Sequence, residues 1–131
     1  MMEILTLPFP PSINGYWRHP TKGPLAGRHL ISAEGREYRQ AVQAFVGHHQ
    51  IGRVEGRLSV AIEVFPPDRR KRDLDNLPKG ILDSLTHAGV IEDDGHIDSL
   101  LIERKGIHKG GMVRVFVTAI QGEDNGTPEN S

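Results

Sequence analysis

The most constraining feature of the chain is a strict alternation of apolar and polar residues that stops at a pair of prolines. In the run LSVAIEVF the apolar side chains recur at every second position, at Leu58, Val60, Ile62 and Val64. This period places them on one face of a β-strand. The Pro66-Pro67 pair then ends the strand, because proline cannot donate the hydrogen bond that sheet pairing requires. A strand with one buried face is therefore predicted.

The segment AEGREYRQAVQAFVGHH, residues 33–49, has the periodicity of an amphipathic helix. Its apolar side chains recur at helical spacing, at Tyr38, Ala41, Val42 and Phe45. The Arg and Gln residues fall on the other face, and Ser32 is a suitable N-cap. The segment is therefore expected to pack one face against a sheet.

A second helix of about 13 residues is predicted after the prolines. Its apolar positions are Leu77, Ile81, Leu85 and Ala88. Asp75 or Asn76 is the expected N-cap, Pro78 is tolerated in the first turn, and Gly89 suits the C-terminal end. This spacing leaves Lys79 and Asp83 pointing away from the core.

Three further strands complete the expected fold. EILTLP forms the first strand, residues 12–31 form a loop rich in Gly and Pro, IDSLLIERKGI forms a strand, and the turn KGG leads to the last strand, MVRVFVTAI. The order is β-α-β-α-β-β, ending in a hairpin. We expect an α+β fold in which a mixed sheet packs against helices.

The length and composition exclude several classes of protein. A chain of 131 residues suits a single compact domain. No apolar run reaches the roughly 20 residues that span a bilayer, and the N-terminal residues lack the features of a signal peptide. The expected location is therefore the cytoplasm. There is no cysteine, which excludes a disulfide framework and thiolate chemistry.

The net charge of −1 hides an uneven distribution. The segment from Gly122 to Ser131 holds three of the 17 acids and no base, so residues 1–121 carry 16 cations against 14 acids. Residues 1–121 are expected to form the domain, and residues 122–131 an acidic, disordered tail. Four of the cations are consecutive, at Arg69, Arg70, Lys71 and Arg72. Such a run suits binding of a polyanion such as DNA, and it also suits a solvated surface turn.

Carboxylates follow the basic run directly. Asp73 and Asp75 point the same way if the backbone is still extended there, and their hard oxygen atoms suit Mg²⁺ or Mn²⁺. Asp94 can join them only if the chain after Gly89 runs back along the helix. Lys79, one helical turn after Asp75, could offset charge that develops in phosphoryl transfer, or simply pair with Asp75 or Asp83.

Competing interpretations of these residues differ in strength. DLDN opens like a calcium-binding EF-hand loop, but Pro78 stands at the glycine position and Ser84 at the twelfth, so this loop is excluded. A bare D-x-D also occurs in nucleotide-sugar enzymes and in surface turns. The histidines show no zinc-ligand spacing and are expected to be exposed or structural. These residues suit a metal-dependent enzyme of phosphoryl transfer, with a non-catalytic DNA-binding module and a structural or inhibitory protein as alternatives.

The assembled motifs resemble the RusA family of Holliday-junction resolvases. The resemblance is carried by DRRKRDLDNLPKGILDSLTHAGVIEDD, with support from LPFPPSINGYWRH, SAEGREYR and KGGMVRVFVT, and it spans about residues 3–120. It implies that Asp73, Asp75 and Asp94 bind Mg²⁺ or Mn²⁺ and that Lys79 is essential, with Asp93 a less certain neighbour.

The resemblance also implies a homodimer whose two sites cut a four-way DNA junction symmetrically. The residues implied to contact DNA are Arg69, Arg70, Lys71, Arg72, Asn76, Asn14 and Arg18. Exposed apolar residues that would form the dimer interface cannot be separated from the core by sequence alone, and Phe65, which lies off the face of Leu58 and Val64, is a candidate for either.

Overall fold

The strand predicted before the prolines forms a central strand of a four-stranded sheet. The computed structural model describes residues 1–120, and the strands stand in the order β1 (Met2–Pro8), β6 (Met112–Ala119), β4 (Leu58–Phe65) and β5 (Ile97–Arg104). β6 is antiparallel to both of its neighbours, whereas β4 and β5 are parallel. The prediction of a mixed sheet in an α+β fold is therefore confirmed.

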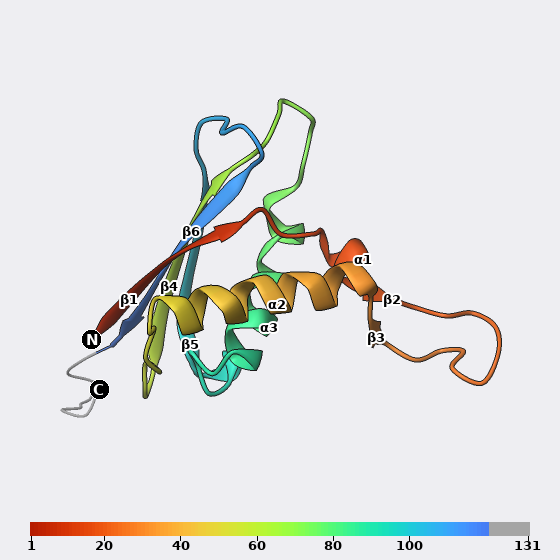
Figure 1. The fold of residues 1–131 in the computed structure, drawn as a ribbon, viewed down its shortest axis with the longest axis horizontal. Helices are drawn as coiled ribbons and strands as arrows, with labels where there is room; N and C mark the ends of the chain where they lie inside the picture. The colour runs from red at the N-terminus through yellow and green to blue at the C-terminus, as the bar shows by residue number, and fades with distance from the viewer. Residues whose placement is uncertain (121–131) are drawn as a thin grey trace, which may run out of the picture.

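Two helices cover one face of this sheet (Figure 1). They are α2 (Ala33–His48) and α3 (Pro78–His87). The core between the layers contains the side chains that periodicity predicted to be buried, among them Tyr38, Val42, Val60, Ile62, Ile81 and Leu85. Alternate residues of the strands face away from the helices. No helix of the described chain covers that other face of the sheet.

The predicted hairpin between the last two strands is wrong. β5 and β6 lie on opposite sides of β4, and the segment that joins them crosses the end of that strand. There the Lys105 N–H donates to the carbonyl of Val64 (2.7 Å), and the His108 N–H donates to the carbonyl of Pro66 (2.9 Å). β6 takes the inner position because its alternate valines are fully buried, whereas most of β5 is exposed and suits an edge.

The start of α3 also differs from the prediction. Neither Asp75 nor Asn76 caps the helix, because both lie in a separate 3₁₀ turn, η1 (Leu74–Asn76), and Leu77 is the N-cap without a side-chain bond. Pro78 at the first helical position has no amide hydrogen to be capped. The helix has 10 residues, shorter than expected. Its end is as predicted, with Gly89 at φ 83° after the C-cap.

The predicted loop over residues 12–31 contains short regular elements. Ser32 caps α2 as expected, since its Oγ accepts from the Gly35 N–H at 2.9 Å. Before it come α1 (Ile13–Tyr16), β2 (Trp17–Arg18) and β3 (Leu30–Ile31), with β2 and β3 paired antiparallel. The residues between these two strands extend away from the domain as an arm (Figure 1).

The side chain of Asp83 is not directed freely to solvent, although its position on the helix predicts that it points away from the core. Its carboxylate accepts two bonds from the Arg39 guanidinium, at 2.9 and 2.7 Å, and one from the Tyr16 hydroxyl. The Arg39 Nε–H also donates to the Tyr16 oxygen (3.0 Å). Burial, followed by the bond to Asp83, raises the pKa of Tyr16. The three side chains tie α1, α2 and α3 together.

Removing the Asp83 carboxylate is expected to destabilise the fold. The Asp83→Ala variant leaves the Tyr16 hydroxyl and the Arg39 guanidinium without their shared acceptor, at a cost of about 1–3 kcal/mol. Urea unfolding followed by circular dichroism measures this loss. Asp98→Ala removes the partner of Arg57 in an exposed pair, with both side chains 45% exposed, and should leave stability almost unchanged because solvent screens such a pair. Equal losses would contradict a supporting role for the Asp83 network.

Among the helices within residues 1–120, none has the length and apolar character needed to cross a bilayer.

Candidate active site

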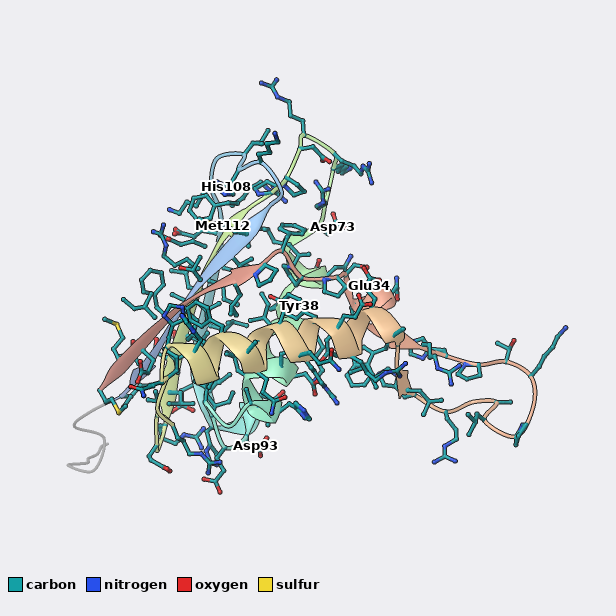
Figure 2. All side chains as sticks on the ribbon, in the orientation of Figure 1. Glu34, Tyr38, Asp73, Asp93, His108 and Met112 are labelled. Atoms are coloured by element: carbon teal, nitrogen blue, oxygen red, sulfur yellow. The ribbon has the colours of Figure 1, made fainter. Side chains whose placement is uncertain are left out.

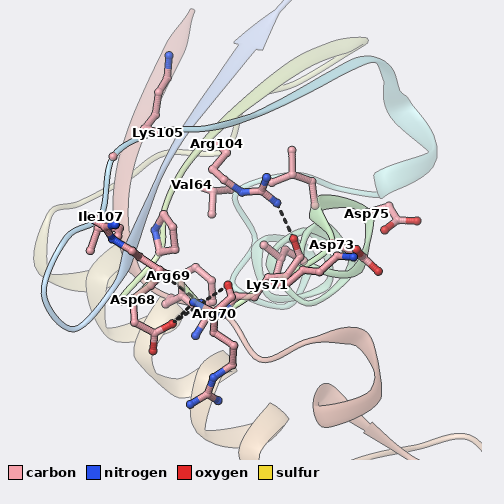
Figure 3. Close-up of a pocket in the computed structure, with 16 residues that line it drawn as sticks. Val64, Asp68, Arg69, Arg70, Lys71, Asp73, Asp75, Arg104, Lys105 and Ile107 are labelled. Carbon is pink, nitrogen blue, oxygen red and sulfur yellow. Dashed lines mark hydrogen bonds and ion pairs between the residues drawn. The ribbon is translucent and has the colours of Figure 1, made fainter.

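A cleft of about 990 Å³ opens beside the C-terminal end of β4 (Figure 3). One wall is the segment after the two prolines, which contributes the basic run, Asp73 and Asp75. The other wall is the end of β5 and the turn after it, which contributes Arg104 and Lys105. The cleft therefore joins the motif that the sequence singled out to two cations about 30 residues further along the chain.

Arg72 differs from the other three cations of the basic run. It donates to the Asp68 carboxylate at 2.8 Å, and its guanidinium carbon lies 5.3 Å from the centre of the Phe9 ring. The bond from Arg72, together with the backbone N–H of Arg70, holds the pKa of Asp68 below its usual value. Arg72 thus shapes the loop, while Arg69, Arg70 and Lys71 remain exposed in the cleft.

Asp73 and Asp75 line the cleft, but not for the reason predicted. The backbone is extended at Asp73 (φ −86°, ψ 129°) and turns into η1 immediately after it, so the two residues do not share one face of an extended strand. Both side chains are exposed, and both are directed along the same side of the cleft (Figure 3). The 3₁₀ turn, rather than strand geometry, presents this pair of carboxylates.

The chain does return along α3 after Gly89. The 3₁₀ turn η2 (Asp94–His96) follows, and the Asp94 carboxylate lies 3.5 Å from the ammonium of Lys79 in the first turn of α3. Lys79 therefore pairs with Asp94, and not with Asp75 or Asp83 as the sequence also allowed. The two side chains are 48% and 41% exposed, so both remain accessible to a ligand.

The three carboxylates fit a hard divalent cation by chemistry but are not gathered around one point. Within residues 1–120 no three Asp, Glu or His side chains lie close enough together to hold a metal ion. Asp73 and Asp75 line the cleft, whereas Asp94 pairs with Lys79. Carboxylate oxygens are the ligands that Mg²⁺ and Mn²⁺ prefer.

Asp93 has a local structural role. Its carboxylate accepts from the Gly95 N–H (3.2 Å) and so caps η2, and this bond is the main cause that lowers the pKa of Asp93. Figure 2 shows Asp93 and Asp73 on opposite sides of α2. Asp93 is therefore separate from the carboxylates of the cleft.

The remaining residues predicted to contact DNA do not line the cleft itself. Asn76 lines an adjoining hollow together with Arg70 and Lys71. Asn14 is exposed on α1 and Arg18 on β2, at the base of the arm, and neither lines the cleft or the hollow. The tail beyond residue 121 was predicted to be disordered and lies outside the described residues.

Sequence reasoning missed Arg104 and Lys105. The two cations are visible in the sequence as a basic pair directly after LLIE. Nothing in the sequence related this pair to the DLDN motif. The Arg104 guanidinium donates to the carbonyl of Arg72, which holds the end of β5 against the basic loop. The arrangement can bind a phosphate between cations on two walls and present carboxylates beside it.

Comparison with known proteins places the chain in a family. The family model described as Endodeoxyribonuclease RusA matches residues 8–118. The Crossover junction endodeoxyribonuclease rusA of Enterobacteria phage HK97 is 37% identical over 116 residues, covering 88% of this chain and 92% of the phage protein. The Crossover junction endodeoxyribonuclease RusA of Escherichia coli (strain K12) is 37% identical over 120 residues, covering 91% of this chain and 96% of that protein.

One solved structure, the periplasmic domain of Helicobacter pylori MotB, aligns with a TM-score of 0.39 and 14% identity over 92% of this chain and 75% of that one, and it adds nothing to the assignment. The family match instead covers the whole cleft, including the basic run, Asp73 and Asp75, and it also covers the pair of Lys79 and Asp94 outside the cleft. This chain belongs to the RusA family of endodeoxyribonucleases.

Proposed function

We propose that this protein is a metal-dependent, structure-selective endodeoxyribonuclease that resolves four-way DNA junctions by paired, symmetric nicks, in DNA recombination and repair. The observation that carries the proposal is the family match over residues 8–118. The cleft supports it, because cations stand on two walls and the carboxylates of Asp73 and Asp75 lie on one of them, next to the basic run. Such a surface binds the DNA backbone and keeps acidic groups next to a bound phosphate.

Asp73, Asp75 and Asp94 are the proposed ligands of Mg²⁺, with Mn²⁺ as the alternative. A divalent ion bound by these carboxylates would supply Lewis-acid stabilisation of the scissile phosphate and would activate a water for attack. The reaction is hydrolysis: water attacks phosphorus in line, the 3′ oxygen leaves, and the product carries a 5′-phosphate. The chain's own residues orient that phosphate and offset its charge.

Lys79 is the proposed residue that offsets the charge created by the reaction. Its ammonium lies 3.5 Å from Asp94 and is half-exposed, so it is close to one proposed ligand and free to approach a phosphate. A positive charge placed there is worth more as negative charge accumulates on the phosphate oxygens. Arg69, Arg70 and Lys71 hold the neighbouring backbone phosphates.

Cleavage of a labelled four-way junction tests this function. We expect paired nicks with Mg²⁺, no cleavage once EDTA removes the metal, and no cleavage of a linear duplex of the same sequence. Binding should persist without metal and weaken steeply with salt, because phosphate contacts release counterions. Junction binding without any metal-dependent product would instead favour the non-catalytic DNA-binding module.

A homodimer follows from the proposed reaction. Residues 1–120 of each chain form one cleft with Asp73 and Asp75, and symmetric cuts in two strands require two identical sites related by a two-fold axis. A DNA substrate of this kind also agrees with a location in the cytoplasm. The exposed apolar residues of the sheet indicate which surface could form the dimer interface.

A further inference from the structure

The edge strand β5 carries unusually exposed apolar side chains. Leu100 is 44% exposed and Leu101 is 53% exposed, on opposite faces of the strand. β5 pairs with β4 along one side only, and no strand of residues 1–120 pairs with its other side. Proteins normally protect a long, apolar edge strand with charges, proline or a covering element, because it recruits another strand. This edge is therefore suited to pairing.

The backbone of β5 defines which groups are free to pair. Lys105 donates its N–H to the carbonyl of Val64, so the odd-numbered residues of the strand direct their backbone groups to β4. From Ser99 to Arg104 the pairing with β4 is regular. Since successive residues alternate, the N–H and C=O groups of Leu100, Ile102 and Arg104 point to the open edge. An incoming antiparallel strand must bond to these residues.

A second copy of β5 satisfies this requirement in one favourable register. If a two-fold axis passes through Leu101, then Leu100 faces Ile102 of the second copy, and these residues exchange backbone hydrogen bonds. The apolar stretch Leu100-Leu101-Ile102 is centred on the axis and meets itself. Shifting the register by two residues places Leu100 opposite Arg104, or Ile102 opposite Asp98, and loses this match.

Charges also agree with this register. Asp98 and Arg104 stand three residues on either side of Leu101, so this register brings each near the oppositely charged residue of the second copy, although within its own chain Asp98 pairs with Arg57 and Arg104 donates to the carbonyl of Arg72. Both side chains are exposed. Ser99 faces Glu103, and no like charges stand directly opposite one another. The strand is thus complementary to itself in shape, backbone polarity and charge.

We propose that two copies of this chain dimerise by antiparallel pairing of their β5 strands about a two-fold axis at Leu101. The two sheets then form one continuous sheet, with the helices of both copies on the same side. Because Arg104 at the end of β5 lines the cleft, the two clefts lie on one face at either end of the paired strands. This inference rests on the dimer of the proposed function, for which it supplies the interface.

Cysteine cross-linking tests the register directly, because the chain contains no cysteine. In the Leu101→Cys variant the new side chain faces its own counterpart in a pair without hydrogen bonds, where Cα atoms lie about 4.5 Å apart, within reach of a disulfide. Mild oxidation should produce a covalent dimer that reductant removes, seen on a non-reducing gel. Wild-type sedimentation establishes independently whether the protein is dimeric.

Two matched variants serve as controls. Leu100 is 44% exposed, close to the value of Leu101, but it faces Ile102 of the second copy, so Leu100→Cys should remain monomeric on the gel. Ile4→Cys lies on the other edge strand, in the same row of the sheet as Leu101 through Phe116 and Ala61, and should also remain monomeric. A dimeric wild type whose Leu101→Cys variant does not cross-link would overturn the interface, and so would a monomeric wild type.

Preferential cross-linking through Leu100 or Ile4 would overturn the register or the strand. Junction cleavage by the reduced wild-type protein is measured in parallel and separates the two proposals. Cross-linking through Leu101 without any junction cleavage contradicts the proposed function and supports the interface. Cleavage without cross-linking through Leu101 contradicts the interface alone.

Discussion

The Asp75→Asn variant should bind a four-way junction at least as tightly as the wild type and cut it about 100- to 1,000-fold more slowly or not at all. The substitution preserves the size of the side chain but removes its negative charge from a cleft lined by cations. Loss of a charged ligand costs transition-state stabilisation of about 3–4 kcal/mol, and every 1.4 kcal/mol is about a tenfold loss in rate. Binding rises or stays the same because a repulsion with phosphate is lost.

Single-turnover cleavage and gel-shift titration on the same junction measure the two effects. Glu92→Gln is the matched control, since it removes one exposed carboxylate close to Asp94 in sequence that lines neither the cleft nor its adjoining hollow. It should cut at the wild-type rate. Full activity in Asp75→Asn would contradict the assignment of the cleft as the active site, whereas equal loss in both variants would indicate a general charge effect.

The Gly35→Ala variant should have the largest effect on stability among the glycine substitutions in helices. A Cβ at this position would lie 2.4 Å from the backbone oxygen of Tyr16 and 2.8 Å from Cγ1 of Ile31. Backbone cannot yield as a flexible side chain does, and Tyr16 is itself held by Arg39 and Asp83. Overpacking of this kind costs about 1–3 kcal/mol, which exceeds the gain of at most about 1 kcal/mol from replacing glycine in a helix.

Urea denaturation measures the change, and Gly47→Ala in the same helix is the control. No heavy atom lies within 4 Å of a Cβ built at Gly47, so only the gain in helix propensity applies there. The two variants should therefore shift the unfolding midpoint in opposite directions. Stabilisation by both would show that the contact between α1 and α2 at Gly35 adjusts freely, contrary to the packing described here.

The candidate site was predictable as far as its chemistry is local. The DLDN motif, the basic run before it and Lys79 are neighbours in sequence, so spacing alone brought them together. The contact of Arg72 with Phe9 could not be predicted, because Phe9 lies far away in the sequence, whereas the bond of Arg72 to Asp68 is local. The same applies to Arg104 and Lys105, which reach the cleft only because β5 lies parallel to β4.

The sequence by itself determined which face of each strand and helix is buried. Leu58, Val60, Ile62 and Val64 are buried as their period requires, since a period of two or 3.6 residues is a property of one segment and needs no partner. The caps at Ser32 and Gly89 followed for the same reason: both depend on bonds within a few residues.

The tertiary structure decided which elements become neighbours. β6 lies between β1 and β4 although β5 precedes it in the chain, and Asp83 meets Arg39 across two helices although its own helix predicted an exposed face. Pairing of this kind depends on how much apolar surface all the elements can bury together, and no single segment carries that information. The exposed edge of β5, with Leu101 at its centre, is likewise a consequence of where the sheet ends.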